Sequence, residues 1–468
     1  MQYKVAMPFG EDYPDPIDAM DGARLSRQVG VQVLELGRSR SDPAHRRQLV
    51  EHLRRRRTRD GRLVVLDHLP RRDGLGVLTV TGEMLLPRIS WEIPGVRSQL
   101  RAVGLREVEQ ACGCLSERLV RLCNEELSAV TIDDTAADLR RQGHMASVHH
   151  VMPLANPVGK GEGGPEPFVP RQGWHLGDRG PEAACAGPVL YPPQRRSDGA
   201  IRVGIVDTGI TSQVRTDGWL QGVARTGDNV DPLDALPAGG DGFLDMGAGH
   251  GTFVAGIVEQ VAPMADIHVH RALDSDGVGS ELQLACAMVH AVREGRQILN
   301  LSLGYRTADG LPPVALSAAL DEIGAMERER GEEVLMIAAA GNDGDSEPYW
   351  PAAFRRVVSV AALTADLAPA PWATHGFWVT CSTVGQGICS TYVEGEESYD
   401  TDPDPDVFGP DSWALWSGSS FAAPQITGAV ARYCQERGLA PRRALEQLLP
   451  VGYPLPGFGR ALPVLPGH

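Results

Sequence analysis

From about residue 200 onward the chain alternates apolar runs with helical stretches, and this alternation constrains its fold more than any other feature. Nearly continuous apolar runs that end in polar turns are typical of buried parallel strands. Such runs occupy residues 201–209, 265–273, 296–304, 333–342 and 356–363. Helical stretches lie between them, at residues 282–295 and 314–330. Alternating strands and helices predict a doubly wound α/β fold, in which ligands bind at the carboxyl ends of parallel strands.

Four polar residues stand at the ends of these predicted strands or at the starts of helices. Asp207 closes the first strand in GIVDTG, and Asn342 closes a later strand in MIAAAGND. His250 lies in the Gly-rich turn GAGHGTFVAGIV, and Ser420 lies in the small-residue turn WSGSSFAAPQITGAVA. Both turns run into predicted helices. An acid, a base and a nucleophile in the order Asp, His, Ser match one of the chain orders known for this catalytic triad.

The chemistry of acyl transfer requires these residue types together. The Ser420 hydroxyl is a weak nucleophile and needs a base, and a histidine such as His250 titrates near neutral pH. Asp207 would fix the tautomer of that imidazole. The Asn342 amide and the Ser420 backbone N–H would stabilise the oxyanion, where one donor contributes about 3 kcal/mol. Each residue alone reads as a cap or a turn former, but the four together predict a catalytic site.

The same segments resemble the subtilase family of serine peptidases over residues 200–449. IVDTG is similar to the aspartate motif of that family, GHGTFVAGI to its histidine motif and GSSFAAP to its serine motif. NLSLG and AAAGN resemble the strands that flank its specificity pocket. The resemblance implies a subtilisin-like fold and a serine endopeptidase that acts on peptide or protein substrates. It implies catalysis by Asp207, His250 and Ser420, with Asn342 in the oxyanion hole.

The resemblance also implies a substrate that lies as an extended strand between two backbone edges. One edge is the segment Asp274–Ser280, and the other follows the predicted strand at 296–304. The edge residues expected to bind substrate are Gly277, Gly279, Ser302, Leu303 and Gly304. Tyr349 falls where the family often has Gly at the floor of the first specificity pocket. It either narrows that pocket and selects a small residue before the cut, or it points outward.

Composition and position divide the rest of the chain. The predicted divisions are an uncharacterised region 1–75, a small α/β domain 76–155, a Gly/Pro-rich linker 156–199, the catalytic domain 200–455 and a tail 456–468. In the second division we expect strands at 78–86, 118–123 and 145–154 and helices at 96–113 and 131–143. The region resembles a subtilase propeptide, which implies an intramolecular inhibitor. The alternative is an accessory domain with a ferredoxin-like sandwich.

Region 1–75 has weaker patterns. VQVLEL at 31–36 and RLVVLD at 62–67 predict short strands. The Arg-rich stretch 46–59 is compatible with a solvated helix, with an acidic partner or a basic cleavage site as alternatives.

Charge and composition exclude some classes of protein. A net charge of −16 argues against a nucleic-acid partner. No apolar run approaches the roughly 18 residues that span a membrane. The start of the chain lacks the pattern of a secretory signal, so we expect a cytoplasmic protein. Its eight cysteines are then expected as reduced thiols, with a Cys381–Cys389 disulfide as the alternative for an exported protein.

No metal site or required cofactor is predicted. The loop at 394–411 carries eight acidic residues, and we favour a solvated loop there over a Ca²⁺ site or a surface that selects basic substrates. His144, His149, His150 and His175 lie near one another in sequence but lack the spacing of metal ligands.

The predicted function is therefore hydrolysis of peptide bonds through an acyl-enzyme on Ser420. Self-processing and specificity for one precursor peptide are both open. The alternative is a regulatory or binding module on a subtilase scaffold, held inactive by its N-terminal region.

Overall fold

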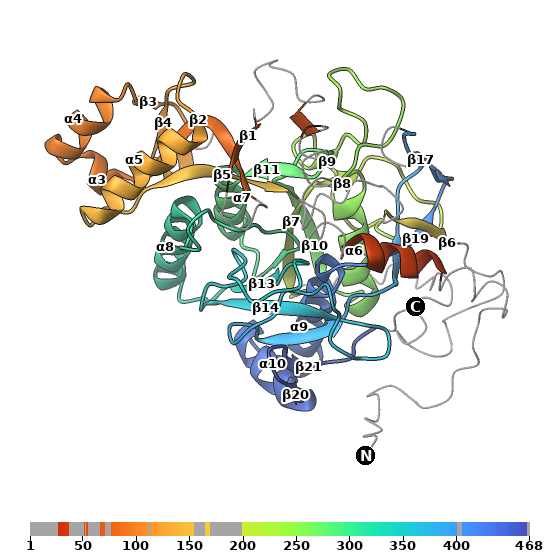
Figure 1. Ribbon diagram of the computed structural model, residues 1–468. Helices are drawn as coiled ribbons and strands as arrows, with labels where there is room; N and C mark the ends of the chain where they lie inside the picture. Colours follow the sequence, from red (N-terminus) through yellow and green to blue (C-terminus); the bar gives the residue numbers. More distant parts are fainter. Residues whose placement is uncertain are drawn as a thin grey trace.

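The protein contains a large sheet covered by helices on both faces and a smaller sheet packed beside it (Figure 1). This computed structural model describes residues 27–36, 51, 53–54, 66–70, 76–110, 113–153, 164–168, 199–399 and 405–465. No helix among these residues is long and apolar enough to cross a membrane.

The large sheet has eight strands in the order β10-β7-β12-β13-β14-β15-β21-β20. Every neighbouring pair is parallel except β20 with β21. The strands are β7 (Arg202–Asp207), β10 (Asp266–Arg271), β12 (Ile298–Leu301), β13 (Leu335–Ala339), β14 (Val357–Leu363), β15 (Cys381–Val384), β20 (Tyr453–Leu455) and β21 (Gly459–Ala461). The predicted doubly wound α/β fold is confirmed. The strand order reverses between β7 and β12, where such sheets bind ligands beyond the carboxyl ends of their strands.

Helices cover both faces of this sheet. The five are α6 (His250–Val261), α7 (Glu281–Arg293), α8 (Val314–Arg330), α9 (Ala423–Arg437) and α10 (Pro441–Leu448). Ile205 and Ile337 lie in one buried core with residues of α6 and α9. Val206 and Met336, their neighbours along the strands, lie in a second core with residues of α7 and α8. Side chains that alternate between two apolar layers explain why these strands read as continuous apolar runs.

Short strands complete the large domain. They are β6 (Glu166–Phe168), β8 (Ile210–Thr211), β9 (Val230–Asp231), β16 (Ile388–Thr391), β17 (Gly395–Glu396), β18 (Val407–Phe408) and β19 (Trp413–Trp416). Among the described residues, the 3₁₀ turns of this domain are η4 (Ser419–Phe421) and η5 (Leu449–Val451), and η1 (Gly113–Leu115) lies in the N-terminal domain. β6 comes from the predicted linker and pairs antiparallel with β19. The linker therefore contributes a strand to the catalytic domain, which its Gly/Pro-rich composition did not indicate.

The smaller sheet is built mainly by residues 66–153, in the order β11-β5-β2-β4-β3 with β1 beside β2. Its strands are β1 (Leu66–Leu69), β2 (Val77–Pro87), β3 (Arg106–Val108), β4 (Leu119–Cys123), β5 (Ser147–Pro153) and β11 (Val278–Ser280). Its helices are α3 (Arg88–Trp91), α4 (Pro94–Ala102) and α5 (Ala129–Arg141). From β2 to β5 the order is βαββαβ, the ferredoxin-like arrangement.

The helix predicted over 96–113 is wrong beyond Ala102. Gly104 follows the end of α4 with φ 85°, a left-handed conformation that terminates helices. Three residues of the remaining stretch form β3 instead, which pairs with β4.

The smaller sheet packs against the layer formed by α7 and α8 (Figure 1). Leu85, Leu119 and Met152 from this sheet are buried in the same core as Leu284 of α7 and Ile323 of α8. Backbone pairing also joins the two domains, because β11 belongs to the large domain and pairs antiparallel with β5 of the N-terminal domain. Apolar burial therefore holds the N-terminal domain on the catalytic domain.

Residues 27–36 form a helix, so the strand predicted at 31–36 is wrong. Val29, Gln32 and Leu36 are buried, and their spacing of three and four residues is that of one helix face. This N-terminal helix, the red helix beside α6 and β19 in Figure 1, joins the core that contains α6 and α9.

Other predictions for region 1–75 fall mainly outside the described residues. Of the strand expected at 62–67, Leu66 and Asp67 lie in β1. Of the Arg-rich stretch, Leu53 is buried, so that stretch is not solvated on every side.

The cysteines differ from both expectations. Cys381 and Cys389 are buried and neither is disulfide-bonded, so the disulfide proposed between them is wrong. Cys114 takes part in a disulfide, so the prediction of reduced thiols throughout is also wrong.

Candidate active site

Asp207 and His250 meet beyond the carboxyl end of the parallel sheet. Asp207 is the last residue of β7, and His250 is the first residue of α6. Nδ1 of His250 lies 2.7 Å from Oδ1 of Asp207, and both side chains are buried. The backbone N–H of Thr208 donates to the same oxygen at 2.8 Å. This pairing assigns the proton to Nδ1 and leaves Nε2 as the basic nitrogen.

Two glycines explain the GHG sequence around the histidine. Gly249 is the residue before α6 and has φ 78°, a conformation that favours glycine. A Cβ on Gly251 would lie 2.2 Å from the carbonyl oxygen of Gly209. The helix that carries His250 can therefore approach the turn after Asp207 only with glycine at that position.

Asp231 connects the two loops that carry the acid and the base. Its Oδ2 accepts hydrogen bonds from Thr208 Oγ1 and from Gly249 N, both at 2.9 Å. Asp231 is almost fully buried, and this burial raises the pKa of its carboxyl despite those bonds. This residue was not predicted from the sequence. Its one signal, an Asp in NVDP, is indistinguishable from an ordinary turn aspartate.

Ser420 lies in the turn η4, directly before α9, and is buried. Its hydroxyl donates to the carbonyl oxygen of Ser302 at 3.0 Å. Among the described residues, no hydrogen bond joins Ser420 to His250, although the rings of His250 and Phe421 have centroids 5.4 Å apart. A serine hydroxyl turns about a single torsion, and catalytic hydrogen bonds often form only once substrate binds.

The amide of Asn342 is oriented by the turn that contains Ser420. Oδ1 of Asn342 accepts from the backbone N–H of Ser419 at 2.9 Å. Nδ2 therefore lies on the other side of the amide, 3.6 Å from where a Cβ of Gly418 would stand. The structure thus brings Asn342 to the turn that carries Ser420, where the sequence placed the oxyanion donors.

A buried chain of hydrogen bonds fixes the backbone of Ser420. Thr427 Oγ1 donates to Asn300 Oδ1 at 2.9 Å, and Asn300 Nδ2 donates to Ser302 Oγ at 2.8 Å. Ser302 Oγ then donates to the carbonyl oxygen of Ser420 at 2.7 Å. Asn300 and Thr427 were not predicted, because their role depends on a contact between β12 and α9.

Tyr349 points inward, between two backbone segments. Its hydroxyl donates to the carbonyl oxygen of Gly304 at 2.8 Å, and its side chain is buried. A Cβ on Gly304 would lie 2.5 Å from the Tyr349 ring, and one on Gly341 would lie 2.9 Å from it. Leu303, between Ser302 and Gly304, is also buried. The alternative of an outward Tyr349 is therefore wrong.

The other predicted cleft edge is paired with the chain's own N-terminal domain. Gly277 forms a turn with φ 77°, and β11 follows it. In the antiparallel register of β11 with β5, Gly279 stands opposite Met152. The backbone edge expected to bind substrate thus binds the strand that ends the N-terminal domain.

Residue Gln32, which the sequence analysis missed, links the N-terminal helix to the strand before the nucleophile. Its Nε2 donates to the carbonyl oxygen of Leu415 at 2.9 Å, and its Oε1 accepts from Ser417 Oγ at 2.7 Å. Trp416, which lies between Leu415 and Ser417 in the sequence, packs edge-on against the His250 ring, with ring centroids 5.4 Å apart. A glutamine on an apolar helix face is the only sequence signal of this contact.

Buried contacts with carboxylates account for the histidines near 150. His150 Nδ1 lies 2.8 Å from Glu281 Oε2, and this carboxylate also accepts from Tyr305 at 3.0 Å. His149 Nδ1 lies 2.7 Å from Glu83 Oε2. These histidines therefore stabilise the N-terminal domain and its contact with α7. His144 belongs to neither pair, and His175 lies outside the described residues.

Glu83 has a strongly shifted pKa. Burial raises it, but hydrogen bonds from Arg121 and His149 and their charges outweigh burial and lower the pKa to about 2. The carboxylate therefore stays ionised in the folded domain.

The acidic loop packs on the large domain where it is described. Asp411 accepts from the backbone N–H of Thr216, and Glu397 is buried and accepts from Asp406 N at 3.3 Å. Residues 400–404 lie outside the described residues. The described acidic residues of this loop thus include structural acceptors as well as solvated groups.

Comparison with known proteins identifies the class. The family model described as Subtilase family matches residues 198–450. This match covers more than half of the chain, so the protein belongs to the subtilase family. The thermophilic serine proteinase of Bacillus sp. (strain AK1) is 27% identical over 259 residues, which are 52% of this chain and 55% of that protein. Thermitase of Thermoactinomyces vulgaris is 28% identical over 239 residues, 49% of this chain and 73% of thermitase. The chain thus spans about half the length of the first of these relatives.

Solved structures extend the similarity to the N-terminal half. Fervidolysin from Fervidobacterium pennivorans, a keratinolytic enzyme related to subtilisin, matches with a TM-score of 0.55 and 19% identity over 88% of this chain and 61% of its own. The epidermin leader peptide processing serine protease of Staphylococcus aureus matches with a TM-score of 0.52 and 16% identity, over 82% of this chain and 96% of its own. These likenesses concern the fold, and they reach well beyond residues 198–450.

Proposed function

We propose that this subtilase is a serine endopeptidase that hydrolyses peptide bonds through an acyl-enzyme on Ser420. The observation that carries the proposal is the buried pair of Asp207 and His250 at 2.7 Å, beside a serine turn that also orients Asn342. An acid, a base and a nucleophile with preorganised donors constitute the machinery of acyl transfer.

In the proposed reaction, Ser420 Oγ attacks the carbonyl carbon while His250 Nε2 takes its proton. Asp207 stabilises the imidazolium that forms. The oxyanion accepts hydrogen bonds from Asn342 Nδ2 and from the Ser420 backbone N–H. His250 then gives its proton to the leaving amine. Water, activated by the same histidine, hydrolyses the acyl-enzyme and restores the serine.

The narrowed pocket supports a preference for small residues before the cut. The Tyr349 ring occupies the space between the backbones of Gly304 and Gly341, where the side chain before the scissile bond would enter. Large side chains would then have to displace a buried, hydrogen-bonded ring.

The N-terminal domain is proposed to be an intramolecular inhibitor that the enzyme cuts away. Its strand β5 already occupies the edge β11 in the strand-addition mode that substrates use. The chain leaves β5 as Leu154-Ala155-Asn156, and Ala155 is the first small residue. We therefore expect self-processing after Ala155.

A restricted, precursor-processing role is the proposed biological setting. A pocket for small side chains limits the sequences that fit, and a protease that processes a leader peptide shares this fold. Casein compared with defined peptides tests this: efficient degradation of casein would favour a general protease.

A second candidate is a binding module held shut by its N-terminal region. Two observations favour it: β5 covers the edge β11, and Ser420 Oγ is bonded to Ser302. Labelling with a fluorophosphonate probe separates the two functions. The endopeptidase predicts labelling of wild type, hydrolysis of small-residue peptides, and loss of both in Ser420→Ala. Absence of labelling and hydrolysis in the folded wild type would favour the binding module.

A further inference from the structure

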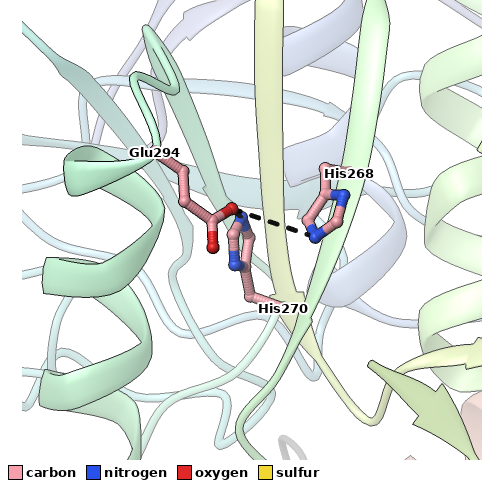
Figure 2. A group of neighbouring side chains, drawn as sticks. All are labelled: His268, His270 and Glu294. Atoms are coloured by element: carbon pink, nitrogen blue, oxygen red, sulfur yellow. Dashed lines mark ion pairs between the residues drawn. The ribbon is translucent and has the colours of Figure 1, made fainter. Parts of the chain in front are cut away.

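Two histidines and a glutamate converge at the edge of the large sheet, away from the proposed catalytic residues (Figure 2). His268 and His270 lie two residues apart on the edge strand β10, so both side chains point to the same side of the sheet. Glu294 is the residue at the C-terminal end of α7. Among the described residues, this is the one group of three or more His, Cys, Asp or Glu side chains placed to hold a metal.

The spacing of the three donor atoms suits one ion. Nε2 of His268 and Nε2 of His270 lie 4.0 and 3.9 Å from Oε2 of Glu294, and all three lie within 4.8 Å of one another. Ligands held about 2.0–2.2 Å from a tetrahedral zinc ion stand roughly 3.4 Å apart. Glu294 is half exposed at a helix end, so small side-chain rotations close the difference.

The burial of His270 gives independent evidence of a ligand. Its side chain is 8% exposed, and its Nε2 is buried without a hydrogen-bond partner among the described residues. A buried imidazole nitrogen without a partner is costly, because it has given up its water. Figure 2 shows this ring beneath the Glu294 carboxylate, with His268 across from it. A cation between them would satisfy the nitrogen.

Burial and neighbouring positive charges both act on the two histidines. Burial, followed by the nearby charges of His268 and Arg296, lowers the pKa of His270 to about 3. Burial also lowers the pKa of His268. The positive charge of Arg296 is offset by its ion pair with Asp266 at 3.1 Å.

We propose that His268, His270 and Glu294 bind a divalent transition-metal ion, represented by Zn²⁺, with water completing its coordination. Two imidazoles and one carboxylate form a donor set that Zn²⁺ accepts, whereas Ca²⁺ and Mg²⁺ prefer oxygen ligands alone. The ion would tie β10 to the end of α7. These elements flank β11, and β10 lies beside β7, where Arg271 stands opposite Asp207. The ion would thus stabilise the packing of the edge strand β10 against the C-terminal end of α7.

The test uses the full-length Ser420→Ala chain, free of any histidine tag and stripped with EDTA, so that no self-processing intervenes. Zn²⁺ alone is titrated by isothermal titration calorimetry, and Co²⁺ is added separately to record its visible absorption. We expect one equivalent of Zn²⁺ per chain, a tetrahedral or five-coordinate Co²⁺ spectrum, and a higher Tm with Zn²⁺.

In that background, Glu294→Gln should weaken Zn²⁺ binding at least roughly tenfold, and His270→Ala should abolish it. His144→Ala, which removes a histidine outside the group, should bind like the parent. Glu294→Gln lies at a half-exposed helix end, and an unchanged metal-free melting curve will show that its fold is intact. The proposal would be overturned if the parent took up no Zn²⁺. It would also be overturned if His270→Ala and Glu294→Gln both took up as much Zn²⁺ as the parent. Neither result depends on proteolytic activity.

Discussion

The catalytic domain and the N-terminal region use buried polar groups in different ways. In the catalytic domain, Asp207, His250 and Ser420 stand where strands end or helices begin, within short motifs. In the N-terminal region, Gln32 contacts Ser417, which is 385 residues away in the sequence, and His150 contacts Glu281, which is 131 residues away. The first arrangement builds chemistry from local turns, whereas the second builds an interface. Substitutions in the catalytic domain should therefore change the rate of hydrolysis. Substitutions in the N-terminal region should change the stability of the protein and the release of the N-terminal domain.

The largest expected effect belongs to Asp207→Asn. An amide cannot hold the His250 tautomer or stabilise its imidazolium, so kcat should fall about 10⁴-fold. Steady-state hydrolysis of a small-residue peptide measures this. Asp321→Asn, on the exposed face of α8, should leave kcat unchanged. An equal kcat in Asp207→Asn and wild type would show that Asp207 takes no part in catalysis.

Asn342→Ala should lower kcat by roughly 10²–10³-fold with little change in KM, because the lost hydrogen bond forms only with the oxyanion. The same assay separates the two constants. A rise in KM at constant kcat would instead show that Asn342 binds the ground state of the substrate.

In the N-terminal domain, Glu83 should make the stability of the fold depend on pH. Its folded pKa of about 2 lies below the ordinary 4.5, so its contribution to stability is complete above about pH 4.5 and is lost as pH falls toward 2. The contribution amounts to about 3 kcal/mol. Melting curves of the Ser420→Ala chain between pH 2 and pH 6 measure it.

Glu83→Gln should be less stable at pH 6 and should lose less stability on acidification. Glu92→Gln, at an exposed position, should follow the parent. A pH dependence in Glu83→Gln as steep as that of the parent would show that other carboxylates control the acid response.

Tyr349→Gly should open the specificity pocket. The kcat/KM ratio for peptides with Phe rather than Ala before the cut should rise about 10–200-fold. Tyr349→Phe keeps the ring and loses the hydrogen bond to Gly304, so it should retain the preference for Ala. A cleavage profile dominated by large aromatic residues in wild type would contradict the narrowed pocket.

Features that depend on residues close together in the sequence could be predicted, whereas features that depend on distant contacts could not. The parallel sheet and the positions of Asp207, His250 and Ser420 were predictable, because each depends on a strand end or turn within a few residues. The inward direction of Tyr349 was not, because two conformations of one loop were equally compatible with EPYWPAAF.

Longer-range contacts could not be predicted from local patterns. VQVLEL fits both a strand and a helix, and packing against the core of α6 and α9 decides for the helix. Asp231 and Gln32 become functional candidates only through partners 23 and 385 residues away. His268 and His270 gain a third donor from Glu294, which lies on another element.

We propose above all that Ser420 catalyses peptide hydrolysis and thereby releases the N-terminal half. Intact-mass spectrometry of the purified full-length wild type beside Ser420→Ala tests it most directly. We expect two fragments from wild type, separated after Ala155, and one uncut mass from Ser420→Ala. Identical, uncut masses for both proteins, with no wild-type cleavage of small-residue peptides, would contradict it.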